Sequence, residues 1–257
     1  MNRKRTTIAA LGAAAVGLSI VSVSPAWGDN APGVKHGAGG SPASRVVACK
    51  LLGVTNYPGG VSSNQACNAA FAEGGEAVFN NWNEVRVPDT RPNYQQGAPD
   101  APANKAPKWR QTMPDGKLCS AGDSNDQRAK GLNLARTDWP TTDLPKGGSA
   151  FTFSYAHAAV HNPYTFYYFV TKDGYDPSKP LTWNDLEDTP FLVAHNQKPN
   201  GEQDLFDEKR KTTNLAAQLP NKSGKHLIFT IWQGNVKTDG AVQSNEAFIS
   251  CADVNFK

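Results

Sequence analysis

The second half of the chain alternates short aromatic and β-branched runs with turn-forming residues, and this pattern constrains the fold most. Residues 150–157 alternate apolar and polar positions, and residues 165–171 are almost entirely aromatic or β-branched. Residues 226–232 and 246–256 are two further candidate strands. Short strands divided by Gly, Pro and Asn turns predict a mostly β chain, an immunoglobulin- or fibronectin-III-like sandwich with long loops and short helices.

The first half is less regular. Residues 67–74 are rich in Ala and could hold a short helix, while residues 86–117 are dense in Pro, Asn, Gln and Gly and predict a long loop region. We find no internal repeat and no low-complexity linker. The length fits one β-rich domain, or at most two small ones.

Residues 1–28 have the pattern of a secretory signal. Three basic residues precede an apolar run over residues 8–23, and small-x-small cleavage motifs end at Ala26 and at Gly28. The apolar run is too short to favour a transmembrane helix. We therefore expect a secreted, extracellular protein with a signal peptide at 1–28, a short tail or pro-segment at 29–35 and one domain at 36–257.

The charge balance limits the partners. The formal net charge is +3, and the signal segment holds three basic residues and no acidic one, so the processed chain is neutral. A neutral chain has no field that would attract nucleic acid or an anionic membrane, and we expect neither as a partner. A neutral polymer would be compatible.

The chain has four cysteines, and an even number in an exported protein predicts two disulfides. Three pairings are possible. We favour Cys49–Cys67, a local link, together with Cys119–Cys251, which closes a long loop. The absence of a Cys-x-x-Cys motif argues against a zinc ribbon and against a thioredoxin-type redox site.

Familiar catalytic motifs are missing: there is no Gly-x-Ser-x-Gly, no His-Glu-x-x-His, no phosphate-binding loop and no dinucleotide fingerprint. Two of the five histidines merit attention. His36 would offer both its amine and its imidazole to a metal if it became the first residue, and one more histidine would complete a three-nitrogen Cu(II) site. His161 lies at a strand end, a suitable place for that second ligand, whereas His157 is expected deeper in the sheet.

Five segments, in order, resemble bacterial lytic polysaccharide monooxygenases, also called chitin-binding type-4 domains. The first is HGAGGSPASR at 36–45. The others are PDGKLCSAG with GLNLARTDWP at 114–140, the segment 159–187 around His161, SGKHLIFTIW at 223–232 and EAFISCADVNF at 246–256. The resemblance extends from His36 to the end of the chain.

The resemblance implies a copper-dependent oxidase that acts on crystalline chitin or cellulose with an external electron donor, as a monomer. His36 and His161 correspond to the copper ligands. Ala159 corresponds to the small residue on one axial side of the metal, and Phe256 to the axial aromatic on the other.

Two further assignments follow the resemblance less closely. Glu246 or Gln243 corresponds to the polar group that positions the oxygen species. Trp82 is a candidate for stacking on a sugar ring at the flat binding face, although a core position is an equal alternative.

One departure from the family pattern concerns the residue before His36. Gly33, Val34 and Lys35 precede it, and cleavage after Ala26 or Gly28 would leave its nitrogen as an amide, a poor metal ligand. A second protease could cut after Lys35, the signal could be cut at His36, or the tail could stay. The last outcome would favour a non-catalytic chitin- or cellulose-binding protein, and a copper-binding wall protein is a third hypothesis.

Overall fold

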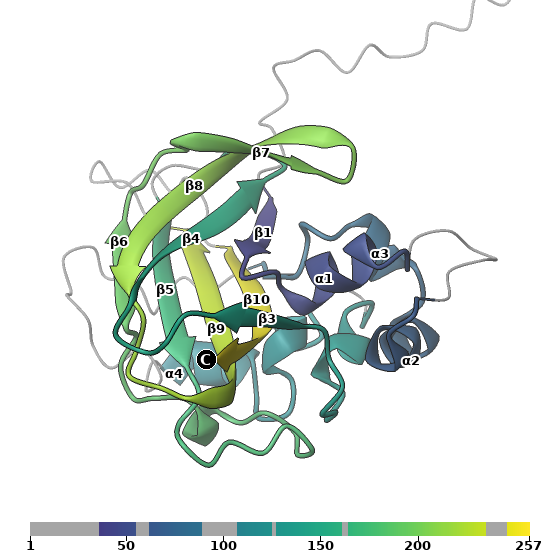
Figure 1. Ribbon diagram of the computed structural model, residues 1–257. Coiled ribbons are helices and arrows are strands. Elements are labelled where there is room, and N and C mark those ends of the chain that lie inside the picture. Colours follow the sequence, from purple (N-terminus) through teal and green to yellow (C-terminus); the bar gives the residue numbers. More distant parts are fainter. Residues whose placement is uncertain (1–35, 55–61, 89–106, 125–126, 161–163, 235–245) are drawn as a thin grey trace, which may run out of the picture. The chain divides into compact units, whose positions relative to one another are not determined.

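A computed structural model describes residues 36–54, 62–88, 107–124, 127–160, 164–234 and 246–257. These residues form two β-sheets with short helices beside them (Figure 1). The first sheet has the strand order β1–β4–β8–β7, and all its neighbouring pairs are antiparallel. Its strands are β1 (Gly37–Ser41), β4 (Ala150–His157), β8 (Glu208–Gln218) and β7 (Gly201–Leu205).

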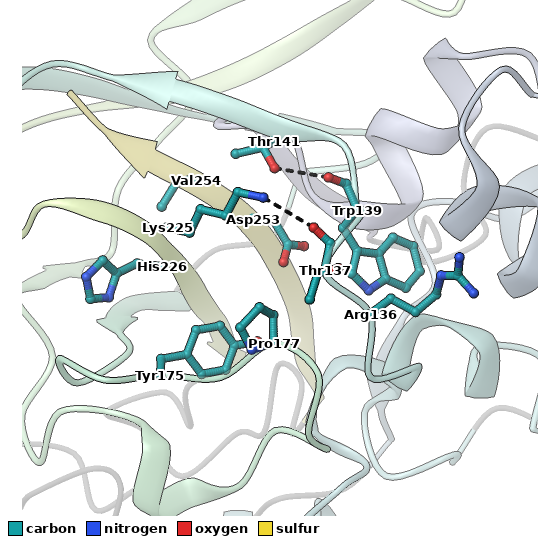
Figure 2. A pocket seen from close by; sticks show the side chains of 10 residues that line it. All are labelled: Arg136, Thr137, Trp139, Thr141, Tyr175, Pro177, Lys225, His226, Asp253 and Val254. Atoms are coloured by element: carbon teal, nitrogen blue, oxygen red, sulfur yellow. Dashed lines mark hydrogen bonds between the residues drawn. The ribbon is translucent and has the colours of Figure 1, made fainter.

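In the second sheet the path β2–β10–β9–β5–β6 consists of antiparallel pairs. Its strands are β2 (Arg86–Val87), β10 (Ala247–Phe256), β9 (Gly224–Gly234), β5 (Tyr164–Val170) and β6 (Leu192–His195). A further strand, β3 (Thr141–Leu144), pairs in parallel with the last four residues of β10, where the sheet borders a pocket (Figure 2).

The helices are short. They are α1 (Arg45–Leu51), α2 (Gln65–Gly74), α3 (Ala77–Asn80) and α4 (Pro107–Thr112), with 3₁₀ helices η3 (Leu118–Ser120), η4 (Lys130–Asn133) and η5 (Trp183–Asp185). The helix predicted over 67–74 lies within α2, whose first turn is capped by the Asn64 side chain, which accepts a hydrogen bond from the Cys67 amide. The predicted loop 86–117 contains β2 and α4, and its residues 89–106 lie outside the described ranges. No described helix is long and apolar enough to cross a bilayer.

The burial of the strands explains their sequence patterns. In β4 exposed and buried positions alternate in the first residues, because one face of the first sheet meets solvent. In β5 every residue is buried, because one face packs against the first sheet and the other against the short helices α1 to α4 and η3 to η5 with their connecting loops. These helices and loops are called the helical layer below. The predicted β-sandwich is confirmed, and the aromatic runs mark the sheet that is covered on both sides.

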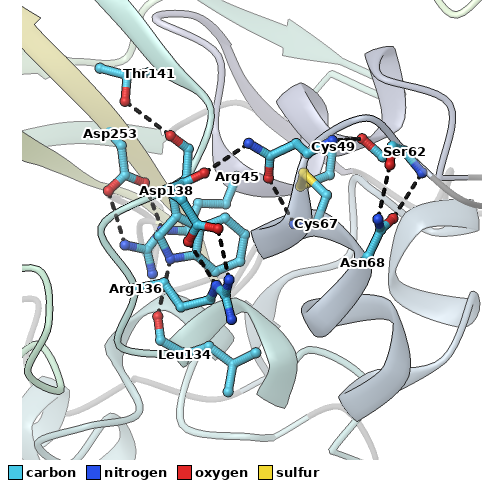
Figure 3. The surroundings of a disulfide bond; sticks show 12 residues. Arg45, Cys49, Ser62, Cys67, Asn68, Leu134, Arg136, Asp138, Thr141 and Asp253 are labelled. Carbon is cyan, nitrogen blue, oxygen red and sulfur yellow. Dashed lines mark hydrogen bonds and ion pairs between the residues drawn. A yellow bond between two sulfur atoms is a disulfide. The ribbon is translucent and has the colours of Figure 1, made fainter.

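Disulfides and an ion pair hold the helical layer together and join it to β10. Both disulfides have the predicted pairing, with Cα–Cα distances of 5.3 Å for Cys49–Cys67 and 5.4 Å for Cys119–Cys251. Figure 3 shows the first of these and the nearby Arg45, whose Nε and Nη2 donate to the two carboxylate oxygens of Asp253 at 2.7 and 3.0 Å. The paired guanidinium and carboxylate satisfy each other in the core, and the charge of Asp253 holds the pKa of Arg45 above its usual value against the effect of burial.

Candidate metal centre

His36 lies directly before β1 and is fixed by its backbone. Its carbonyl oxygen accepts hydrogen bonds from the amides of Ala158 at 2.8 Å and Ala159 at 3.1 Å. The register of β1 on β4 continues this contact, with Gly37 opposite His157. Two predicted site residues, His36 and Ala159, are therefore neighbours, as a result of a strand pairing between segments about 120 residues apart in sequence.

Gly37 is required for this pairing. A Cβ atom at Gly37 would lie 2.6 Å from the Ala156 carbonyl oxygen and 2.6 Å from Tyr155 Cε1, which is closer than real Cβ contacts. Any larger residue would push β1 away from β4. The small residue after His36 thus sets the position of the histidine itself.

The His36 imidazole is buried, with 4% of the residue exposed. Its ring centroid lies 5.5 Å from that of Phe248, and its Nδ1 lies 3.5 Å from Glu84 Oε1. Burial lowers the pKa of His36, Glu84 opposes that shift, and Arg86 adds to it. A lowered pKa keeps the imidazole neutral near pH 7, the form that binds metals.

Charged side chains of alternating sign border this imidazole. Arg128 Nη2 lies 3.9 Å from Glu84 Oε2, and Arg86 forms an ion pair with Glu246. Between 23% and 32% of each of these side chains is exposed. In the ladder between β2 and β10, Arg86 lies opposite Phe248, whose ring contacts His36. The ion pair with Arg86 therefore keeps the predicted residue Glu246 near His36.

The prediction that Phe256 lies beside the metal-binding histidine His36 is wrong. Phe256 and Phe248 point to the same inter-sheet face of β10 but are eight residues apart, about 26 Å at the usual strand rise. The ring beside His36 belongs to Phe248, whereas the ring of Phe256 lies 5.7 Å from that of His226. Phe248, and not Phe256, is therefore the phenylalanine whose ring lies beside His36.

The surface assignment of Trp82 is also wrong. Only 4% of Trp82 is exposed, and its ring meets Phe206 edge-on at 5.3 Å with the Arg210 guanidinium 5.7 Å away. A ring enclosed in this way has no free face for a sugar. The core alternative is the correct one.

Two other predicted residues, His161 and Gln243, lie outside the described residues. Within the described ranges no group of three or more His, Cys, Asp or Glu side chains is placed to hold a metal ion. The roles of His161 and Gln243 stay predictions.

The remaining buried histidines have structural partners. His157 lies within the sheet, as expected, with Nε2 2.8 Å from Thr213 Oγ1, and burial lowers its pKa to about 4. His226 lies beside the pocket of Figure 2, where its Nδ1 is 3.0 Å from Thr171 Oγ1. That pocket is next to Asp253 and Val254, towards the end of β10 that is remote from Phe248.

Sequence reasoning missed Glu84, Arg86 and Phe248. Arg86 is the first residue of the segment predicted to be a loop and Glu84 lies two residues before it, and nothing local marks either of them as a neighbour of His36. Phe248 stands two residues after Glu246 in the same motif, and the choice between it and Phe256 needed the register of β10 on β9 and β2.

The comparison with known families agrees with this geometry. A family model described as "Lytic polysaccharide mono-oxygenase, cellulose-degrading" matches residues 36–254, so the match begins at His36. The chain belongs to the lytic polysaccharide monooxygenase family. The resemblance inferred from the five segments is confirmed.

The names of two curated relatives refer to different polymers, chitin and cellulose. The chain is 37% identical over 224 residues to the chitin-binding protein CbpD of Pseudomonas aeruginosa, covering 86% of this chain and 47% of that protein. It is 32% identical over 222 residues to a lytic cellulose monooxygenase of Streptomyces ambofaciens, covering 86% of this chain and 53% of the relative. The chain thus spans about half the length of these curated relatives.

A solved structure matches over its whole length. The cellulose-active monooxygenase CelS2, determined in complex with copper, is 31% identical with a TM-score of 0.66, and the alignment covers 86% of this chain and 99% of that one. Copper is therefore supported as a cofactor at the level of the family. The chemistry of His36 is compatible with copper, because burial favours its neutral imidazole, the form that binds metals. Its Nδ1 lies 3.5 Å from Glu84 Oε1, beyond the usual hydrogen-bond length.

Proposed function

We propose that this chain is an extracellular copper-dependent monooxygenase that cleaves crystalline chitin or cellulose oxidatively. The observation that carries the proposal is the double hydrogen bond from Ala158 and Ala159 to the His36 carbonyl. It fixes residue 36 against the segment that leads into His161. Ala159 thus lies beside His36, and His161 follows Ala159 by two residues in the sequence.

In this proposal His36 and His161 hold the copper. Bound copper supplies one-electron chemistry on dioxygen or peroxide that can remove a hydrogen from a strong C–H bond beside the glycosidic link. His36 contributes its neutral imidazole and, after processing, its amine. Phe248 packs against that imidazole and excludes water there. Ala159, whose amide donates to the His36 carbonyl oxygen, places only a small side chain next to the site.

The charged residues around the site have a positioning role in this proposal. Arg86 holds Glu246 by an ion pair beside β10, so that its carboxylate stays near the reacting face. Glu84 faces His36 Nδ1 and can orient the ring or a water near it. An external donor supplies electrons, and the protein acts as a monomer.

The test uses protein that begins at His36, loaded with copper and supplied with a reductant. We expect oxidised oligosaccharides, detected by mass spectrometry, from crystalline chitin, cellulose or both. Protein beginning at Asp29 and the His36→Ala variant are the matched controls and should give none. Absence of oxidised products from both polymers with the processed protein would overturn the proposal.

A second candidate is a chitin- or cellulose-binding protein without catalysis. Lys35 before His36 favours it, because an uncut chain leaves an amide at the metal site. The N-terminal peptide of the protein exported by its host decides between them. A chain starting at His36 supports the enzyme, and a chain starting near Trp27 or Asp29 supports the binding protein.

A further inference from the structure

The turn between β7 and β8 has a strained backbone. Leu205 pairs with Glu208, so two residues, Phe206 and Asp207, make the turn. Their φ angles are 57° and 62°, and a type I′ turn requires a positive φ at both central positions. Glycine and asparagine adopt such angles readily, whereas other side chains crowd the following carbonyl. In the part of the chain that the structure describes, Phe206 is the only aromatic residue with a positive φ. A contact outside the hairpin must therefore offset its strain.

The Phe206 ring makes that contact in the helical layer. It meets the Trp82 ring edge-on with 5.3 Å between the centroids, and Lys50 Nζ lies 4.9 Å from the Phe206 centroid. Leu205, which precedes Phe206, is 2% exposed. Both residues pack with the hydrophobic cluster that contains Trp82 and Phe79. The tip of the β7–β8 hairpin thus reaches from the first sheet to the helical layer and fixes the ring of Trp82.

Trp82 lies two residues before Glu84, in a segment with two anchors. A turn spans the two residues, because the Glu84 amide donates to the Asn81 carbonyl oxygen at 2.9 Å. On the other side of Glu84, the Ile249 amide donates to the Val85 carbonyl oxygen at 2.8 Å and joins the segment to β10. The backbone of Glu84 is therefore held between the buried Trp82 ring and β10.

The position of this backbone matters at the candidate metal centre. One carboxylate oxygen of Glu84 lies 3.5 Å from His36 Nδ1, and the other lies 3.9 Å from Arg128 Nη2. A flexible side chain joins the carboxylate to its backbone, so the backbone decides which groups the carboxylate can reach. A shift of the segment around Trp82 would carry the Glu84 carboxylate away from His36.

We propose that Phe206 is a positioning residue for this centre: by its contact with Trp82 it holds the Glu84 carboxylate against His36. An asparagine at position 206 would relieve the turn but would remove the ring that meets Trp82. The strained turn is retained because the contact needs an aromatic ring at that position. This inference rests on the proposed function, since it assigns a role at the metal centre to a residue of a distant hairpin.

The first test follows the His36 imidazole by NMR in copper-free protein that begins at His36. The loss of signals in His36→Gln assigns the ring. Phe206→Asn suits the left-handed turn and removes the contact with Trp82. We expect it to shift the His36 ring signals in the same direction as Glu84→Gln does. Asp207→Asn is the matched control, because it changes the other turn residue with positive φ, which is exposed, and it should leave these signals unchanged.

A double variant shows whether Phe206 acts through Glu84. Residues in one network have non-additive effects, whereas the effects of independent sites add. We therefore expect Phe206→Asn combined with Glu84→Gln to give the shift of Glu84→Gln alone. Phe206→Tyr keeps the ring and should retain the signals of the unaltered protein. Additive shifts, or signals that do not respond to Phe206→Asn, would overturn the proposal. Phe206→Leu replaces Phe206→Asn in both comparisons if the latter does not fold.

Copper binding separates this inference from the proposed function. Phe206→Asn should weaken Cu(II) binding roughly three- to tenfold, less than the 10–100-fold that loss of a direct outer partner typically costs. Unchanged affinity would overturn the proposal. Shifted imidazole signals in a protein that binds no copper would support the positioning of Glu84 and reject the proposed function. Copper bound through His36, with signals and affinity indifferent to Phe206→Asn, would reject the positioning and leave the proposed function in place.

Discussion

The two ends of β10 each pack a phenylalanine against a histidine, and they differ in what else the histidine meets. At one end Phe248 contacts His36, whose Nδ1 faces Glu84 at 3.5 Å, beyond the usual hydrogen-bond length. At the other end Phe256 contacts His226, whose Nδ1 lies 3.0 Å from Thr171 Oγ1. A buried histidine beside an aromatic ring is therefore not evidence of a site, and the partner of its ring nitrogen distinguishes the two ends.

The largest expected effect separates the two histidines by copper binding. His36→Gln in the processed protein should weaken copper binding more than about 100-fold, since loss of an outer partner alone typically costs 10–100-fold. His226→Gln should leave the affinity unchanged. Isothermal titration with Cu(II) measures both, and copper retained at full affinity by His36→Gln would show that the metal is held elsewhere.

The second prediction concerns the backbone of β1, which fixes the position of His36. Gly37→Ala should lower the free energy of unfolding by about 1–3 kcal/mol, because the new methyl meets the Ala156 carbonyl oxygen and Tyr155. Copper binding should weaken with it as His36 shifts. Gly39→Ala is the control, because its nearest contact is 3.5 Å away. Denaturant titration of both variants measures the difference, and equal stability would mean that β1 tolerates displacement.

The third prediction uses His157, which is buried but belongs to neither end. Its pKa of about 4 in the fold lies below the ordinary 6.5, so between these pH values the unfolded chain binds the proton more readily. Stability from this group is complete above pH 6.5 and falls as the pH drops towards 4, by roughly 2 kcal/mol at pH 5.

His157→Gln keeps a polar partner for Thr213 and removes the titrating group. Urea unfolding at pH 5 and at pH 7.5 should show a smaller loss in this variant than in the unaltered protein. The same loss in both would assign the pH dependence to the other histidines.

The smallest expected effect compares the two phenylalanines. Phe248→Leu and Phe256→Leu should each cost about 1 kcal/mol of stability, because both rings are buried in the same inter-sheet core. Only Phe248→Leu should alter the electron paramagnetic resonance spectrum of bound copper. A spectrum changed equally by Phe256→Leu would contradict the placement of Phe248, and not Phe256, beside the bound metal.

The strands and the disulfides could be predicted because they depend on local pattern and on export. Alternation marks β4, and aromatic runs mark the strands covered on both faces. Which phenylalanine lies beside His36 could not be predicted, since Phe248 and Phe256 share the same parity along β10 and only the register separates them. The alternation of residues determines which face of a strand a side chain occupies, but it does not determine how far along the strand that side chain lies.

The failure at Trp82 has a different cause. A tryptophan in a polar segment has no local signal for burial, and Phe206, which covers it, comes from the β7–β8 turn more than 120 residues later. Glu84 and Arg86 escaped notice for the same reason. Contacts between distant segments decide the surroundings of a site, while local sequence decides its scaffold.

The attachment of the helical layer to β10 bears on how such a chain can diversify. The layer is tied near its start by Arg45 to Asp253 and near its end by β2 to Ala247 and Phe248. Between these anchors the exposed residues of α2 can be exchanged while the hydrogen bonds of Ala158 and Ala159 to the His36 carbonyl oxygen keep His36 on β4. The surface of the helical layer and the backbone that positions His36 can thus change independently of each other.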